Sequence, residues 1–169
     1  SEVARELPRL QIVHQCGTQD YGWLREAYRE VNLRAWVKPF LDRIGDFYAL
    51  ATLAVARAGA TTLAELAAVG LPAVLVPYPY AADGHQRANA LLAAQWGGAV
   101  VVEESEFERT SLAALLRELL RDRSRRRAMA RALKRMSRPE ATRLVGQCVE
   151  SLCRHPRARG AALVAGNGR

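Results

Sequence analysis

The sequence predicts an α/β fold built on a doubly wound parallel sheet and followed by C-terminal helices. Up to about residue 103, short apolar runs alternate with stretches of helical periodicity. The apolar runs are nearly continuous, which is typical of parallel strands covered by helices on both faces. With 169 residues, half of them apolar, the chain can bury the core of one domain.

The predicted elements alternate along this part of the chain. The expected strands are residues 10–14, 33–37, 53–57, 73–76 and 99–102, and the expected helices are residues 20–30, 44–51, 61–69 and 85–96. Gly70 ends one helical pattern and Pro77 ends one apolar run, as expected at such boundaries.

Only helices are expected after Glu103. Apolar residues recur at helical spacing at Leu112, Leu115, Leu116 and Leu119, at Met129, Leu133 and Met136, and at Leu144, Val145, Val149 and Leu152. We expect residues 1–138 to form the α/β domain and residues 139–154 a C-terminal helix. Residues 155–169, rich in Arg, Gly and Ala, are expected to be a disordered tail.

Most of the net charge of +8 lies in one C-terminal segment. Between Arg121 and Arg138 there are nine basic residues and a single acid, Asp122. An amphipathic helix with a solvated basic face explains this pattern. Attraction to anionic lipid or to a phosphorylated substrate is a second interpretation. Nucleic-acid binding ranks third, because no aromatic residues or known binding motif accompany these arginines.

Composition argues against several other classes of protein. No run of about 18 uncharged apolar residues is present and the N-terminus lacks a signal-like pattern, so we expect a cytoplasmic protein without a membrane-spanning helix. The three cysteines lack zinc-like spacing, which argues against a disulfide framework and a metal site. We therefore expect free thiols and no metal.

Residues 57–89 are the most informative segment. They read as the end of a buried strand, a turn at Gly59, a helix whose first turns carry Thr62 and Glu65, a second strand, and a polar loop before Gln86. Glycine lets a backbone come close to a ligand, and the amides that open a helix favour anions. A phosphate group could bind there.

This segment resembles the donor-binding C-terminal domain of the MurG family, the bacterial N-acetylglucosaminyltransferases of peptidoglycan synthesis. These are two-domain enzymes of glycosyltransferase family 28 with the B-type, Rossmann-like fold, and the resemblance extends from about Leu10 to Met136. It implies an inverting transfer of N-acetylglucosamine from UDP-N-acetylglucosamine (UDP-GlcNAc) to a lipid-linked muramyl precursor, without a covalent intermediate or cofactor. The implied location is the cytoplasmic face of the membrane, with peripheral attachment to an anionic surface as a further expectation.

The resemblance implies that Glu65 binds the ribose hydroxyls, a role that suits a carboxylate because it can accept two hydrogen bonds from a vicinal diol. The residues themselves leave an alternative open, since Thr62 and Glu65 have the spacing of a capping box that closes a helix start without a ligand. Gly59, Ala60, Thr61 and Thr62 match the loop and helix start that would hold the diphosphate.

Other matched positions would contact the sugar and the base. Gln86 matches a glutamine that contacts the sugar hydroxyls, and His85 precedes it where relatives differ. Phe40 and Leu41 match the uracil site, although Phe40 could equally belong to the core.

Cys16 and Gly17 match a small-residue loop of the same cleft, in which relatives often carry serine at the position of Cys16. The preceding His14 stands at a strand end and is expected to be structural. No catalytic residue is assigned in this chain, because the family's candidate general base lies in an N-terminal domain that has no counterpart here.

The first strand of the family's donor domain also has no counterpart, and residues 1–9 match the helix that follows its glycine-rich turn. In the strand order 3-2-1-4-5-6 that strand is central, so its absence predicts a sheet split in two. We therefore expect a fragment of a longer enzyme that binds the donor but does not turn over.

Other functions stay open at this point. One is a non-catalytic nucleotide-sugar-binding subunit of a split glycosyltransferase. Another is a related lipid glycosyltransferase that uses UDP-glucose or UDP-galactose. A more remote one is a protein that binds anionic polymers through its basic helices, which predicts salt-sensitive binding independent of Glu65.

Overall fold

The computed structural model describes residues 6–81, 84–106 and 112–154, and the chain divides into two compact units, Ser1–Ser137 and Arg138–Arg169. Of the elements within these described residues, the strands and all helices except α8 lie in the first unit, and α8 (Ala141–Arg154) lies in the second. The predicted tail 155–169 and most of the predicted helix end at 1–9 lie outside the described residues.

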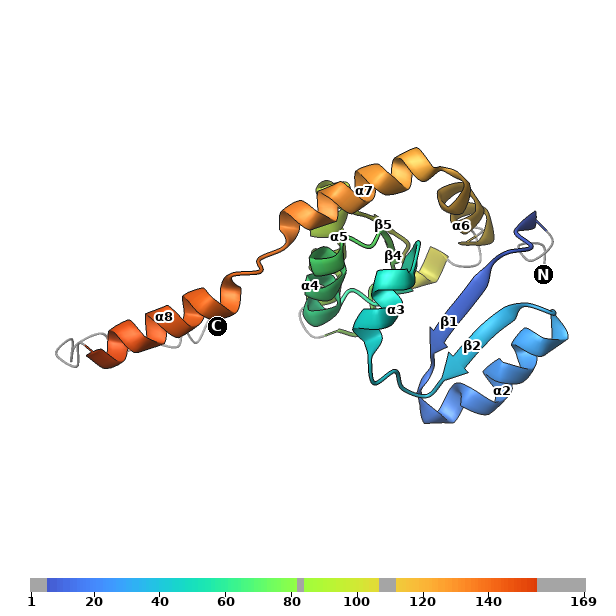
Figure 1. Cartoon of the computed structure of the whole chain (residues 1–169). Helices are drawn as coiled ribbons and strands as arrows, with labels where there is room; N and C mark the ends of the chain where they lie inside the picture. The colour runs from blue at the N-terminus through green and yellow to red at the C-terminus, as the bar shows by residue number, and fades with distance from the viewer. Residues whose placement is uncertain (1–5, 82–83, 107–111, 155–169) are drawn as a thin grey trace. The chain divides into compact units, whose positions relative to one another are not determined.

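The strands form two parallel sheets, as Figure 1 shows in part. One sheet pairs β1 (Gln11–Gln15) with β2 (Arg34–Lys38). The other has the order β3 (Ala54–Ala56), β4 (Ala73–Leu75), β5 (Ala99–Val101). The α/β class with parallel strands is confirmed, and the predicted split between the strand pair and the remaining strands is found. Within the described residues, β1 and β3 each pair on one side only.

The helices of the first unit are α2 (Gly17–Glu30), α3 (Ile44–Leu50), α4 (Ala60–Val69), α5 (His85–Gln95), α6 (Leu112–Arg121) and α7 (Arg123–Met136), with a short 3-10 turn η2 (Glu104–Glu106). Each predicted helix is found. Helix α2 begins at Gly17 and not at residue 20 as predicted. The positive φ of Gly17, 76°, turns the chain directly from β1 into the helix.

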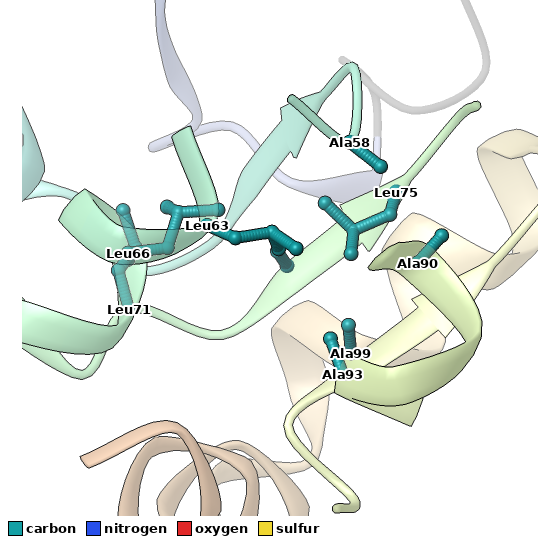
Figure 2. Close-up of a cluster of buried hydrophobic side chains, with 9 residues drawn as sticks. Ala58, Leu63, Leu66, Leu71, Leu75, Ala90, Ala93 and Ala99 are labelled. Atoms are coloured by element: carbon teal, nitrogen blue, oxygen red, sulfur yellow. The ribbon is translucent and has the colours of Figure 1, made fainter. Parts of the chain in front are cut away.

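Helices cover both faces of the three-stranded sheet. All three residues of the central strand β4 are fully buried. Ala73 and Leu75 face a cluster formed with α4 and α5, which includes Leu66 and Ala90 (Figure 2). Val74 points to the other face and belongs to a cluster with Leu119 of α6 and Met129 of α7; Leu53, Val100 and Leu112 pack against it. This two-sided burial explains why the strand is an unbroken apolar run.

Helix α7 approaches two glycines very closely. A Cβ on Gly98, which precedes β5, would lie 2.6 Å from Cγ of Leu133. A Cβ on Gly70, which ends α4 in the left-handed conformation, would lie 2.8 Å from Cγ of Lys134. Lys134 also donates to the carbonyl of Ala68 in the last turn of α4. The basic helix is therefore also a packed structural element.

Helix α8 has no buried residue, and its apolar side chains are exposed at Leu144, Val145, Val149 and Leu152. In the part of the chain that the structure describes, no helix is long and apolar enough to span a bilayer.

Candidate functional site

The predicted site residues lie at or near the carboxyl ends of parallel strands, in two groups. The first follows β1 and β2 and comprises Cys16, Gly17, Phe40 and Leu41. The second follows β3 and β4 and comprises Gly59, Ala60, Thr61, Thr62, Glu65, His85 and Gln86. Open α/β sheets bind ligands at this edge. The two groups belong to separate sheets, so each is described by itself.

Backbone hydrogen bonds tie the first group together. The amide of Cys16 donates to the carbonyl of Lys38, and the amide of Gly17 donates to the carbonyl of Pro39, both at 3.0 Å. The thiol of Cys16 lies 3.5 Å from the same Lys38 carbonyl. The turns after β1 and β2 therefore form one surface, and the thiol is engaged within it.

Phe40 and Leu41 have opposite environments. Phe40 is 67% exposed, whereas Leu41 is 6% exposed and its amide donates to Oε1 of Gln15 at 2.9 Å. The interpretation of Phe40 as a core residue is therefore wrong, because Leu41 enters the interior instead. The Phe40 ring is open to a planar ligand.

The start of α4 shows whether Thr62 and Glu65 form a capping box. The helix begins at Ala60 with Gly59 as N-cap, and no side chain caps it. A capping box needs its threonine at the N-cap, but Thr62 is already the third residue of the helix, so that alternative is wrong. The amides of Ala60, Thr61 and Thr62 have no intrahelical acceptor and open the positive end of the helix dipole. Gly59 has a φ of −65°, so its backbone conformation does not require glycine.

Glu65 lies in the second turn of α4, where it is half-buried. Its carboxylate accepts a hydrogen bond from the hydroxyl of Tyr48 in α3. Burial, together with the negative charge of Glu65 and this hydrogen bond, raises the pKa of Tyr48 above its ordinary value of 10.0. Tyr48 thus holds the carboxylate in place and leaves it oxygen lone pairs for other donors.

Gln86 and His85 open helix α5 after Gly84, whose φ is 62°. The Oε1 atom of Gln86 accepts a hydrogen bond from the amide of Tyr78 at 3.0 Å. Its carbonyl end therefore fixes the loop after β4, and its amide nitrogen remains as a donor. His85 is exposed.

Sequence reasoning missed two side chains that shape the second group. Nδ2 of Asn89 donates to the carbonyl of Ala58 at 3.1 Å, which ties α5 to the loop before α4. Nη1 of Arg57 lies 2.6 Å from Oε2 of Glu104 and 3.2 Å from the carbonyl of Pro77. Arg57 thereby joins the segments that follow β3, β4 and β5. The one feature of the sequence that could have indicated Arg57 and Asn89 is their position at the two ends of the 57–89 segment.

Other titratable residues have structural surroundings. Nδ1 of His14 lies 2.9 Å from the hydroxyl of Tyr28, which links β1 to α2 in agreement with the structural role expected for this histidine. The cysteines Cys16, Cys148 and Cys153 are free thiols. Among the described residues, no three His, Cys, Asp or Glu side chains gather in a way that could hold a metal ion.

The glycosyltransferase family 28 C-terminal domain matches residues 1–145 of the sequence. The chain belongs to this family. Its α/β fold with parallel sheets is that of a family 28 C-terminal domain.

Relatives of this family 28 chain carry one common description. The proteins of Desulfotalea psychrophila and Methylococcus capsulatus are 38% and 42% identical to it, over 86% and 88% of the chain. Both are described as UDP-N-acetylglucosamine–N-acetylmuramyl-(pentapeptide) pyrophosphoryl-undecaprenol N-acetylglucosamine transferase. The chain spans only 40% and 44% of their lengths.

Solved structures agree with this assignment. The crystal structure of Acinetobacter baumannii MurG is 34% identical, with a TM-score of 0.75 over 84% of this chain and 41% of its own. A glycotransferase of kitacinnamycin shares the fold, with a TM-score of 0.60 at 24% identity over 86% of this chain and 37% of its own.

Proposed function

We propose that this family 28 chain is the donor-binding part of an inverting glycosyltransferase that moves N-acetylglucosamine from UDP-GlcNAc to a lipid-linked N-acetylmuramyl-pentapeptide in peptidoglycan synthesis. One observation carries the proposal. Helix α4 starts without a side-chain cap directly after β3, and Glu65 stands one turn further, outside any capping box. An open cluster of amides followed by a held carboxylate suits a diphosphate joined to a ribose.

The diphosphate would bind the amides of Ala60, Thr61 and Thr62, with the Thr62 hydroxyl as a further donor. Glu65, held by Tyr48, would accept hydrogen bonds from the ribose hydroxyls. Charge-assisted hydrogen bonds of this kind are roughly twice as strong as neutral ones. These contacts would fix the donor's orientation without taking part in bond making or breaking.

The remaining predicted residues would contact the uracil and the sugar of the donor. The exposed ring of Phe40 offers a face for the uracil, and Leu41 and the turn at Cys16 and Gly17 border it. The amides of these three residues already donate within the protein, so they would shape the uracil site without donating to the base. The amide nitrogen of Gln86, whose oxygen is fixed by the amide of Tyr78, is a donor for sugar hydroxyls. His85 adjoins it at the start of α5.

The acceptor would be bound by other parts of the enzyme. The chain covers only 40% and 44% of the lengths of two relatives. We propose that the general base and the lipid-binding surface belong to that remainder, with the whole enzyme peripheral to the cytoplasmic face of the membrane. The chain alone should therefore bind the donor without turnover.

Titration of the purified chain with UDP, UDP-glucose, UDP-galactose and UDP-GlcNAc by calorimetry tests this proposal. Glu65→Ala should weaken all four ligands by about 1.5–3 kcal/mol, the usual contribution of hydrogen bonds to a charged group. Glu30→Ala, which removes an exposed carboxylate at the end of α2, is the matched control and should leave affinity unchanged.

Two results would count against the proposal. Unchanged affinity in a folded Glu65→Ala variant would leave Glu65 with no role in ribose binding. Preference for UDP-glucose or UDP-galactose over UDP-GlcNAc would contradict the proposed donor and favour a related lipid glycosyltransferase.

A further inference from the structure

The first unit has a basic concavity away from the carboxyl ends of the strands. A surface cavity of about 210 Å³ is lined by Thr52, Pro72, Arg123, Arg126, Arg127 and Ala130. Thr52 precedes β3 and Pro72 precedes β4, so the cavity lies at the amino ends of these strands. It is therefore at the opposite edge of the sheet from Gly59 and Glu65.

The arginines of this cavity differ in how they are held. Nη1 of Arg126 donates to the carbonyls of Leu119 and Leu120, the latter at 2.6 Å, and so caps the end of α6. Arg123 and Arg127 are exposed and have no acidic partner within the described ranges. One guanidinium is thus anchored and two remain free to move toward a ligand.

Nearby acids do not neutralise this cluster. Glu118 pairs with Arg125, and the Asp122 side chain accepts the amide of Arg125 at 2.8 Å as the N-cap of α7. Helix α7 itself contains seven basic residues and no acid. Like charges held this close repel one another, and an anion bound between them removes that repulsion.

We infer that this cavity binds a phosphate group. Guanidinium groups match phosphate oxygens with paired hydrogen bonds, and Thr52, which also lines the cavity, carries a neutral hydroxyl donor. The phosphate can belong to a free anion such as pyrophosphate or to the headgroup of an anionic lipid. The inference does not depend on donor binding, because it concerns different residues at the opposite edge of the sheet.

Titration of the isotope-labelled 169-residue chain with inorganic pyrophosphate, followed by amide chemical shifts, tests the inference. Saturating UDP is present so that the amides at Ala60 are occupied if donor binding is correct. Shifts should concentrate at Thr52 and around Ala130. Arg127→Gln and Arg123→Gln should each weaken this response about tenfold, as expected when a charged hydrogen bond is lost.

Arg131→Gln is the matched control, because it removes the same charge from the same helix outside the cavity. It should change the affinity less than about twofold, the effect of a distant screened charge. All variants should keep the circular dichroism and the UDP affinity of the parent chain. Equal weakening by Arg131→Gln and Arg127→Gln, or no shifts at the cavity, would overturn the inference.

Vesicle co-sedimentation distinguishes the two sources of phosphate. Vesicles containing phosphatidic acid, compared with phosphatidylcholine alone, should sediment the chain but not Arg127→Gln if the ligand is a lipid headgroup. Sedimentation unaffected by Arg127→Gln, together with Arg127-dependent pyrophosphate binding, assigns the cavity to a soluble phosphate compound. If the chain did not bind UDP but still showed the pyrophosphate-induced shifts at the cavity, the donor proposal would be contradicted and the phosphate inference would stand.

Discussion

At the scale of single residues, the chain separates side chains that hold the site from side chains that are available to a ligand. Asn89 and Arg57 make fixed contacts to the carbonyls of Ala58 and Pro77. Glu65 is partnered by Tyr48, and Phe40 is largely exposed. Available groups surrounded by fixed ones are what a preorganised binding surface requires.

The pairing of Tyr48 with Glu65 can be measured by titration. Because burial is the largest cause of the raised pKa of Tyr48 and the Glu65 charge the next, Glu65→Gln should lower that pKa but leave it above 10.0. The folded state holds this proton more tightly than the unfolded chain does, so the contribution of Tyr48 to stability should fall as pH rises above 10.

Ring-labelled tyrosine NMR resolves the half-buried hydroxyls of Tyr28 and Tyr48 separately. Tyr28, whose pKa is raised by burial and by Cys16, is the internal reference and should not respond to Glu65→Gln. A Tyr48 pKa that is the same in both proteins would mean that the two side chains do not interact.

Sequence patterns were informative about elements and less so about individual contacts. The apolar runs predicted every strand that the structure describes, and most clearly β4, because both of its faces are buried and leave no polar positions. The sequence left the capping box at Thr62 open as an alternative, because its spacing fits a helix that starts later than Ala60. The bond from Asn89 to Ala58 joins positions far apart in the sequence, and only the folded arrangement of α5 against the α4 loop reveals it.

At the scale of elements, α7 is fixed against α4 and β5 by the small size of two glycines. Because a methyl group on Gly98 would meet the side chain of Leu133, the Gly98→Ala substitution should lower the free energy of unfolding by about 1–3 kcal/mol. Urea denaturation measures this change.

Gly22→Ala is the control for this substitution. Gly22 lies within α2, and nothing approaches within 4 Å of a Cβ placed there. Alanine should therefore stabilise that helix by about 0.5–1 kcal/mol. A Gly98→Ala variant as stable as the parent would contradict the close packing of α7 against β5.

At the scale of the whole molecule, the chain is a family 28 C-terminal domain whose sheet is in two parts and whose last helix forms a unit of its own. The strand order of a doubly wound fold predicted the split, and the sheets show it between β1 and β3. The chain divides after Ser137, and the boundary predicted from the sequence lies one residue later, after Arg138.

Removal of α8 tests this division. A chain that ends at Arg138 should keep the free energy of unfolding of the first unit within about 0.5 kcal/mol, the usual range for surface changes, because α8 has no buried residue. Thermal and urea unfolding measure the difference. A larger loss would show that α8 stabilises the α/β unit.

The central claim is that the open start of α4 and the Glu65 carboxylate bind the diphosphate and ribose of a UDP-sugar. A crystal structure of the chain with UDP-GlcNAc tests it most directly. We predict diphosphate oxygens at hydrogen-bond distance from the amides of Ala60, Thr61 and Thr62, and both ribose hydroxyls on Glu65. Donor bound elsewhere, or an unoccupied helix start at saturating donor, would contradict the claim.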